Sequence, residues 1–465
     1  MRLPIPTLAL IASILSVVTA KSSTGDRVLV VLESGIEKGD YSKFWKSLEA
    51  RGYSLTFKSP KDDTAELIKY GERKYDHLIM YAPGQKTFSP ALSPQSILHA
   101  QLDGLNTLYL LSPSLSPLNR DTFREYDLEF TDSSAGNTLI SPFSSLASDP
   151  SSPLIFPAHS PLLSSSPANP VLSPSTLSGG PIVFPEAISH FAGETPYGFP
   201  ILGAPRGSYV GGSGGNSNST AGEGRKGGEV VLAGKMAGVV SAFQTRDNVR
   251  IGFVGSGKAL SDKVWEASVE DQEGVTHRTA NAAFAQDLTS WVFQETGVLR
   301  VECATHWSKT GGEVEKAEYR KNEEVAYSVS ITQYSPSSGT YIPLVTPPSD
   351  LQLEFTMLDP FVRTPLILNS TASSAQGSTT YSASFRAPDR HGVFKFVVEY
   401  WRPGYTYLRS STTTAVVPLR HDEHKRFITG AYPFYGATVS VSVAFVLFCG
   451  MWLGMGEERG RKKAE

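Results

Sequence analysis

The residues of this chain best placed to do chemistry form a glycine-rich stretch that ends in lysine. Residues 252–258 read GFVGSGK after a strand-like VRI, and the spacing of glycine and lysine matches that of a phosphate-binding loop. The next residue is Ala259, where such a loop needs a serine or threonine hydroxyl to bind magnesium. A tight, glycine-rich turn is therefore a better interpretation than a nucleotide site.

Two further patterns could supply a nucleophile. Residues 211–215, GGSGG, match the serine hydrolase elbow, which needs a strained strand-to-helix turn. Ser213 lies in a glycine-rich stretch instead, so we interpret this match as chance. Cys303 and His306 in VECATHW could serve an amidotransferase-like α/β enzyme, but they fall at the predicted start of a β-rich region. A buried structural thiol is the simpler hypothesis for Cys303.

The remaining composition points away from catalysis. The sequence has no HExxH motif, no paired CxxC motif and no cluster of histidines, so it predicts no metal site, no cofactor and no catalytic set. The net charge is -3 at pH 7 and no basic stretch dominates the chain, which argues against a nucleic-acid partner.

The elements that must position these residues begin at residue 26. The segments DRVLVVLE, YSLTFKSP, DHLIMYAPG, NTLYLLSP and VRIGFVGSG read as strands, and YSKFWKSLEARGY and SPQSILHAQLDG read as helices. Short apolar strands that alternate with helices predict a parallel sheet with crossover connections. We therefore expect a flavodoxin-like or Rossmann-like lumenal α/β domain over residues 26–299, closed by the helix NAAFAQDLTSWVFQETGVL.

Two segments of biased composition interrupt this domain. Between residues 141 and 180, 21 of the 40 residues are Ser or Pro, and residues 211–229 are rich in glycine. Such segments bury too little apolar surface to offset their ordering entropy. We predict long mobile loops, after which a strand pattern resumes at EVVLAGKM. A linker between two domains is the alternative, because loops this long are uncommon within one domain.

After residue 300 the pattern changes to alternation with a period of two. It is seen in EEVAYSVSITQY, DLQLEFTML, TTYSASFRAP, GVFKFVVEYW and SSTTTAVVPL, which turn residues separate. Several short strands at this spacing predict a lumenal, β-sandwich-like domain over residues 300–426.

Two apolar segments predict the topology. Residues 1–20 read as a secretory signal peptide cleaved after Ala20, with a signal anchor as the alternative. Residues 434–455 carry no charge and are long enough for a transmembrane helix, with a buried soluble helix as the alternative. A cleaved signal followed by one span makes a single-pass type I membrane protein with a cytosolic tail over residues 456–465.

The tail contains a candidate retrieval signal, and two sequons are candidate N-glycosylation sites. Lys462 and Lys463 stand four and three places from the carboxyl terminus, which fits a dilysine retrieval signal. A basic cluster that only fixes topology is the alternative. Asn218 and Asn369 begin Asn-Ser-Thr sequons and could carry N-glycans in a lumenal chain. Cys303 and Cys449, the latter inside the predicted span, cannot pair within one chain.

Several segments closely resemble the oligosaccharyltransferase subunit of the 48-kilodalton type, called the beta or Wbp subunit in fungi. They are SWVFQETGVLRV (290–301), LQLEFTMLDPFVRT (351–364), HGVFKFVVEYWRPGYTYLRSSTTTAVVPLRHDEHKRF (391–427) and AYPFYGA (431–437). The likeness extends to RVLVVLE, to DNVRIGFVGSG and to the order of signal and span. It departs at the Ser/Pro-rich and Gly-rich segments, which look expanded in this chain.

The resemblance implies a non-catalytic subunit in the endoplasmic reticulum membrane. Its complex would transfer a preassembled glycan from dolichol pyrophosphate to Asn in Asn-X-Ser/Thr sequons. The expected partners are a catalytic multi-pass subunit, a ribophorin II-type subunit and a small DAD-type subunit. Gly436 and Ser440 in the span would allow close packing against partner helices. The alternative function is a membrane-anchored lumenal hydrolase or amidotransferase built on the α/β domain, which fold analogy alone favours.

Overall fold

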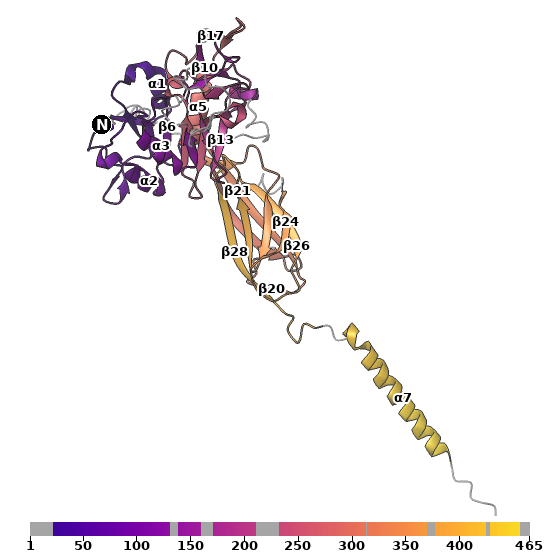
Figure 1. The fold of residues 1–465 in the computed structure, drawn as a ribbon. Coiled ribbons are helices and arrows are strands. Elements are labelled where there is room, and N and C mark those ends of the chain that lie inside the picture. The colour runs from indigo at the N-terminus through magenta and orange to yellow at the C-terminus, as the bar shows by residue number, and fades with distance from the viewer. Residues whose placement is uncertain are drawn as a thin grey trace, which may run out of the picture.

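The computed structural model describes residues 22–130, 138–159, 171–210, 232–312, 314–369, 377–424 and 428–455. The chain passes from a mixed α/β region through a strand-rich region to one C-terminal helix (Figure 1). This order of a mixed α/β region, a β-rich region and an apolar helix confirms the prediction from the sequence.

Five parallel strands form the centre of the α/β region. They are β1 (Arg27–Leu32), β2 (Ser54–Lys58), β5 (His77–Tyr81), β6 (Asn106–Leu110) and β16 (Arg250–Val254). Their order in space is β2-β1-β5-β6-β16. All five were predicted, because each is a short run of β-branched and other apolar residues bounded by turn residues.

Helices cover both faces of this sheet. The helices are α1 (Ser42–Ala50), α2 (Pro94–Leu102), α3 (Pro117–Arg124) and α5 (Asn281–Val292). Val28 and Val30 of β1 share one core cluster with the buried faces of α1 and α5. Leu29 and Val31 share the opposite cluster with α2 and α3. The two faces separate in this way because successive side chains of a strand point to opposite sides.

The sheet continues beyond β16 through antiparallel strands that sequence reasoning missed. They are β15 (Gly238–Gln244), β13 (Gly198–Gly203), β12 (His190–Ala192) and β7 (Leu128–Phe130). Of the strand predicted at EVVLAGKM, the described part contains one β-bridge, between Ala233 and Tyr209, and then the 3-10 helix η6 (Gly234–Met236). Strand β15 begins two residues later, where apolar side chains pair with β16.

The Ser/Pro-rich segment is not one long irregular loop, and that part of the prediction was too broad. It contains β9 (Ser145–Leu146), β10 (Asp149–Ile155) and α4 (Pro174–Leu177). Several of its apolar residues, such as Leu154 and Ile155, are fully buried. The carboxylate of Asp287 on α5 accepts hydrogen bonds at 2.7 Å from the hydroxyls of Ser173 and Thr176. The hydroxyls of serine and threonine in this segment therefore hydrogen-bond to one another and to α5, an arrangement that composition alone does not reveal.

Short elements complete this region. They are η2 (Lys38–Tyr41), β3 (Ile68–Lys69), β4 (Glu72–Arg73), η3 (Pro90–Leu92), β8 (Leu139–Ile140), η5 (Pro157–His159), β11 (Ile182–Val183), β14 (Tyr209–Val210), η7 (Gly257–Leu260), β17 (Ser268–Glu270) and β18 (Thr276–Arg278).

The strand-rich region consists of two five-stranded sheets that share one core. The first contains β19 (Leu299–Ser308), β21 (Glu324–Ser335), β22 (Thr340–Pro343), β25 (Ile367–Leu368) and β26 (Thr379–Arg386). The second contains β20 (Glu318–Arg320), β23 (Gln352–Thr356), β24 (Pro360–Pro365), β27 (Gly392–Tyr400) and β28 (Leu408–Val417). Tyr327 and Val329 of the first sheet pack with Phe355 and Phe396 of the second. Each strand predicted from alternation is present.

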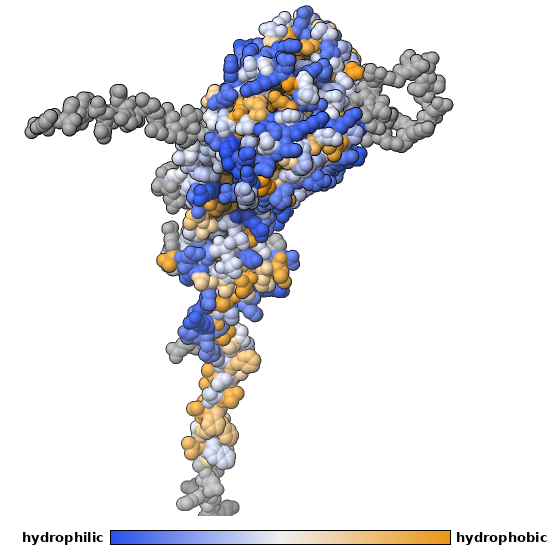
Figure 2. All heavy atoms as spheres, turned by 90° about the vertical axis from the view of Figure 1, so that its left-hand side faces the viewer, coloured by the Kyte–Doolittle hydropathy of each residue, from blue (hydrophilic) through white to orange (hydrophobic). Residues whose placement is uncertain are grey.

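The C-terminal helix α7 (Tyr432–Gly454) follows the 3-10 helix η8 (Thr429–Ala431). The segment Thr429–Gly454 is long and apolar enough to cross a membrane, and no residue of its most apolar window is buried. Figure 2 shows apolar atoms along this helix below the wider part of the molecule. An apolar helix without protein around it is expected to lie in lipid.

Candidate functional site

The glycine-rich loop at residues 252–258 is packed against its own chain. A Cβ on Gly255 would lie 2.3 Å from the carbonyl oxygen of Ile188, and one on Gly257 would lie 2.4 Å from the ring of Tyr81. The hydroxyl of Tyr81 lies 3.0 Å from that of Tyr41, and Lys258 is paired with Glu186. The glycines are required by close backbone contacts, and the lysine already has a carboxylate partner.

The two candidate nucleophiles are not assembled with a base. Cys303 is exposed, so the expectation of a buried thiol is wrong. His306 is buried on the opposite face of β19, where its Nδ1 lies 2.7 Å from the hydroxyl of Tyr319. Burial lowers the pKa of His306. The two side chains diverge because they leave the strand on opposite faces. Ser213 lies outside the described residues.

The structure instead concentrates buried charge where the α/β region meets the strand-rich region. Arg250, the first residue of β16, has 0% of its surface exposed. Its guanidinium donates hydrogen bonds to the carbonyl oxygens of Trp291 (2.8 Å), Thr296 (2.6 Å) and Gly297 (3.0 Å). It also stacks on the ring of Trp291, at 5.1 Å from the centroid. A cation at this place is favoured because the carbonyls at the end of α5 are the negative pole of that helix.

Burial lowers the pKa of Arg250 from 12.5 to about 9, so the side chain is still charged at neutral pH. Its partners are carbonyl dipoles and the hydroxyl of Thr406 at 3.3 Å, and no carboxylate is among its hydrogen-bond partners in the described residues. A planar guanidinium suits this role because it directs several donors in fixed directions.

A second buried cation binds the same segment from the other side. Arg51, just after α1, donates from Nη1 to the carboxylate of Glu295 at 3.0 Å and to the hydroxyl of Ser290 at 2.8 Å. The hydroxyl of Tyr53 donates to the same carboxylate at 2.6 Å. Arg51 and Glu295 are both buried. This ion pair fixes the residues that follow α5 against α1.

Gln294, between these two cations, has a left-handed backbone with φ at 59°. This conformation is uncommon for residues other than glycine. The Gln294 side chain donates to the Asn248 carbonyl at 2.7 Å and to Oδ1 of Asn106 at 3.0 Å. Oδ1 of Asn106 also accepts from the backbone N–H of Arg250 at 3.0 Å. These bonds hold the unusual turn in place.

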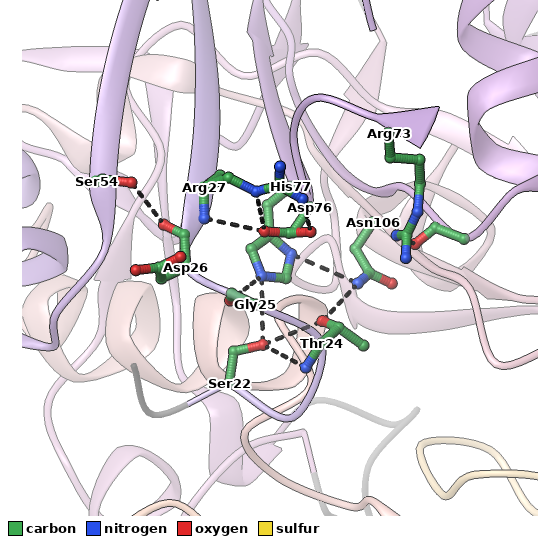
Figure 3. A network of polar contacts seen from close by, with 11 residues as sticks. Ser22, Thr24, Gly25, Asp26, Arg27, Ser54, Arg73, Asp76, His77 and Asn106 are labelled. Carbon is green, nitrogen blue, oxygen red and sulfur yellow. Dashed lines mark hydrogen bonds and ion pairs between the residues drawn. The ribbon is translucent and has the colours of Figure 1, made fainter. Parts of the chain in front are cut away.

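Figure 3 shows the continuation of this network at the amino ends of the parallel strands. The ring of His77 lies between Asn106, whose Nδ2 is 3.4 Å from Nδ1, and the Gly25 carbonyl, which is 3.0 Å from Nε2. The ring also stacks on Phe293. Burial lowers the pKa of His77 to about 4, so the imidazole is neutral at neutral pH. Nδ1 then accepts from Asn106 and Nε2 donates to the Gly25 carbonyl, and the Ser22 hydroxyl lies 3.3 Å from Nε2.

An ion pair lies beside this histidine (Figure 3). Arg27 donates from Nε and Nη2 to the two oxygens of Asp76, at 2.9 and 2.8 Å. Burial acts to raise the pKa of Asp76, but the hydrogen bonds and charge of Arg27 outweigh it, so the pKa is lowered. This bidentate pair ties the start of β1 to the residue before β5.

The strand-rich region reaches the network through the β27–β28 loop. Nε1 of Trp291 donates to the Gly404 carbonyl at 2.9 Å, and Nε2 of Gln244 donates to the Tyr405 carbonyl at 2.8 Å. The backbone N–H groups of Thr406 and Tyr407 donate to the Gly297 carbonyl and to Oδ1 of Asn248, at 2.9 and 2.8 Å. We call Arg250, residues 293–297 and residues 401–407 together the joint.

The joint combines two segments on which the family resemblance rests. SWVFQETGVLRV contributes the end of α5 and residues 293–297, and the long segment 391–427 contributes the β27–β28 loop. Sequence reasoning placed most of the first segment in the helix that closes the α/β domain and predicted strands in the second, but it predicted no contact between them. A signal was present, because Arg250 stands directly before four apolar or glycine residues of a buried strand.

The other predicted site residues are scattered. Asn369 lies just after β25 on the first sheet of the strand-rich region, where its backbone N–H donates to the Thr380 carbonyl. Gly436 and Ser440 are on α7, and the Ser440 hydroxyl donates back to the Ala437 carbonyl. Asn218, Lys462 and Lys463 lie outside the described residues. In the part of the chain that the structure describes, no group of three or more His, Cys, Asp or Glu side chains is arranged to hold a metal.

Comparison with known proteins gives matches over nearly the whole chain. The model of the OST48 N-terminal domain matches residues 19–295, and that of the OST48 middle domain matches residues 306–456. A Schizosaccharomyces pombe protein, dolichyl-diphosphooligosaccharide–protein glycosyltransferase subunit wbp1, is 33% identical over 92% of this chain and 91% of its own length. The 48 kDa subunits of Caenorhabditis elegans and Danio rerio are 32% and 31% identical, over 97% and 93% of this chain and 95% and 92% of their own lengths.

Proposed function

The chain belongs to the OST48 family, and on this premise we propose that it is an accessory subunit of the dolichyl-diphosphooligosaccharide–protein glycosyltransferase. In this role the chain assembles and stabilises the complex that transfers a preassembled glycan to Asn-X-Ser/Thr sequons. The joint carries the argument, because it bonds two lumenal regions into one frame with a fixed geometry. A subunit that positions others needs such a frame.

We also propose that the chain itself is not catalytic. Support comes from the partners of its reactive groups: Lys258 is paired with Glu186, Arg51 with Glu295, and His306 with Tyr319. Glycosyl transfer then occurs in a multi-pass catalytic subunit, with ribophorin II-type and DAD-type subunits as further partners. Nothing in the site favours a hydrolase or amidotransferase.

We further propose the finer fold and the topology. The α/β region is flavodoxin-like over residues 26–299, supported by its β2-β1-β5-β6-β16 order, and the region over residues 300–426 is a β-sandwich, supported by its shared core. Residues 1–20 are a cleaved signal, residues 434–455 are the span, and the bulk of the chain lies in the lumen of the endoplasmic reticulum.

Affinity purification of the tagged full chain in mild detergent tests this function. We expect the other glycosyltransferase subunits to copurify, and depletion of the chain to leave many sequons underglycosylated. A chain that purifies alone, or that has a hydrolase activity removed by Cys303→Ala, would refute the proposal.

The same purification tests close packing of the span. Gly436 and Ser440 lie one turn apart on one face of α7, where small residues let helices approach. Replacing both with leucine is expected to reduce recovery of partner subunits. The matched control replaces Thr438 and Ser442, on the opposite face, with leucine and is expected to leave recovery unchanged. Equal recovery from both pairs would contradict the packing role.

The tail makes a separate prediction. Lys462→Ser with Lys463→Ser is expected to let a reporter that carries this span and tail leave the endoplasmic reticulum, because a dilysine signal is read by position. Acquisition of Golgi-type glycans on the reporter measures the escape. Arg459→Ser with Arg461→Ser removes the same charge and should leave the reporter retained. If both variants were retained, the tail would be only a basic cluster that fixes the topology.

A further inference from the structure

The outer face of the first sheet in the strand-rich region contains a groove lined by hydroxyl groups. Two adjoining hollows of about 550 and 420 Å³ share Thr305 and Ser328, so they form one groove. Serine and threonine from β19, β21 and β26 are its commonest lining residues, among them Thr305, Ser328, Thr332, Thr380, Ser382 and Ser384.

The register of the strands aligns these residues in rows across the sheet. Cys303 faces Ser330, and Ser330 faces Thr380. Leu368 pairs with Tyr381, which places Asn369 opposite Thr380 at the end of the same row. Asn369 itself lines the larger hollow. From Asn369 to Cys303 the row crosses three strand spacings, about 14 Å.

The chemistry of the groove suits a neutral ligand with many hydroxyl groups. Hydroxyl side chains both donate and accept hydrogen bonds. Trp307 and Tyr341 add aromatic surfaces in the two hollows, and the charged side chains there are few. Nε2 of His306 lies 3.4 Å from a carboxylate oxygen of Glu315, and both residues line the larger hollow. An apolar protein segment would bury the lining hydroxyls without offering them a hydrogen bond, which is costly.

We propose that the groove holds an N-linked glycan attached to Asn369 of this same chain. Asn369 is the first residue of the sequon Asn369-Ser370-Thr371, and its side chain lies at the edge where a glycan would enter. The proposal rests on the lumenal placement proposed above. The first sugars cross Thr380 and Ser330 toward Cys303, and their hydroxyls bond to the serine and threonine rows.

Attachment would be carried out by the glycosyltransferase complex to which the chain is proposed to belong. A bond forms between Nδ2 of Asn369 and C1 of the first sugar, while the C1–O bond to the dolichyl pyrophosphate breaks. The dolichyl pyrophosphate leaves with the electron pair, and one Nδ2 proton passes to a base of the catalytic subunit.

Cys303 provides a reporter for glycan in the groove. It is exposed at the end of the row, and the Cys449→Ala background leaves it as the single thiol of the chain. The variant Thr371→Ala removes the sequon without changing any lining residue. The matched control Ser370→Ala alters the neighbouring residue and keeps the sequon.

The full chain, purified with its complex, is labelled with a bulky maleimide and with N-ethylmaleimide. We expect Thr371→Ala to increase the rate of bulky labelling several-fold and to change the rate with the small reagent much less, whereas Ser370→Ala behaves as the parent. Mass spectrometry of the peptide that contains Asn369 shows whether a glycan is present.

The outcomes separate this proposal from the proposed function. An unmodified Asn369, or bulky labelling that is equally fast in Thr371→Ala and Ser370→Ala, would overturn the groove proposal while copurification still supports the subunit role. A chain that purifies without partner subunits would refute the proposed function, on which the groove proposal rests. An Asn218→Gln variant should be labelled at Cys303 at the same rate as the parent. Faster labelling of Cys303 in that variant would also contradict the proposal that the glycan on Asn369 protects it.

Discussion

Replacing Arg250 with methionine is expected to lower the free energy of unfolding of the α/β and strand-rich regions by about 3 kcal/mol or more. The change leaves the carbonyls of Trp291, Thr296 and Gly297 buried without their donor, and a hydrogen bond to a charged group contributes about 1.5–3 kcal/mol. Relief from burying the guanidinium offsets part of this loss. A lower midpoint of heat denaturation of the full chain in detergent measures the effect.

The variant should also loosen the α/β region from the strand-rich region. Limited proteolysis is expected to cut near residues 293–297, which are held by Arg250 in the parent. Arg246→Met is the matched control, because Arg246 is exposed and contacts the ring of Tyr407 from outside. A midpoint for Arg250→Met that equals that of Arg246→Met would show that the joint does not hold the regions together.

Replacing Glu295 with leucine is expected to destabilise the chain by about 3–5 kcal/mol, because it leaves the buried Arg51 cation without its carboxylate. Tyr53 loses its acceptor as well. The expected measurements are an early heat denaturation and reduced recovery of partner subunits.

A second change distinguishes lost charge pairing from lost packing. Arg51→Met combined with Glu295→Leu should recover much of the stability, because a buried ion pair replaced by apolar residues is often close to neutral. Glu266→Leu is the control for an exposed pair, since Glu266 and its partner Arg278 have side chains that are 53% and 76% exposed, and its expected effect is about 0–1 kcal/mol. If the double variant were as unstable as both single losses added, charge pairing would not be the cause.

These predictions test how the joint would serve the accessory role proposed above. The joint converts two separately folded sheets into one frame, so that surfaces on the α/β region and on the strand-rich region keep a fixed spacing. The β27–β28 loop supplies the contact, and β28 leads from it toward α7 (Figure 1). Movement of the joint would therefore change the position of the α/β region relative to the membrane helix.

Much of the fold could be predicted from local pattern. The parallel strands β1, β2, β5, β6 and β16 are short apolar runs between turn residues, and the strands after residue 300 show alternation over several residues. The elements that sequence reasoning did not predict depend on contacts between distant segments. Helix α4 in the Ser/Pro-rich segment is held by hydrogen bonds to Asp287 on a distant helix, and no window of sequence contains both partners.

The sequence by itself determined the order of an α/β region, a β-rich region and an apolar helix, together with the family, because periodicity and motifs are local properties of the chain. Only the tertiary structure decided that Cys303 and His306 diverge and that Gly255 and Gly257 serve packing. It also brought Arg250, residues 293–297 and residues 401–407 together. These outcomes depend on which side chains meet across more than a hundred residues, and burial then gives each charge its partners. Pattern predicts the elements, and packing between them assigns their roles.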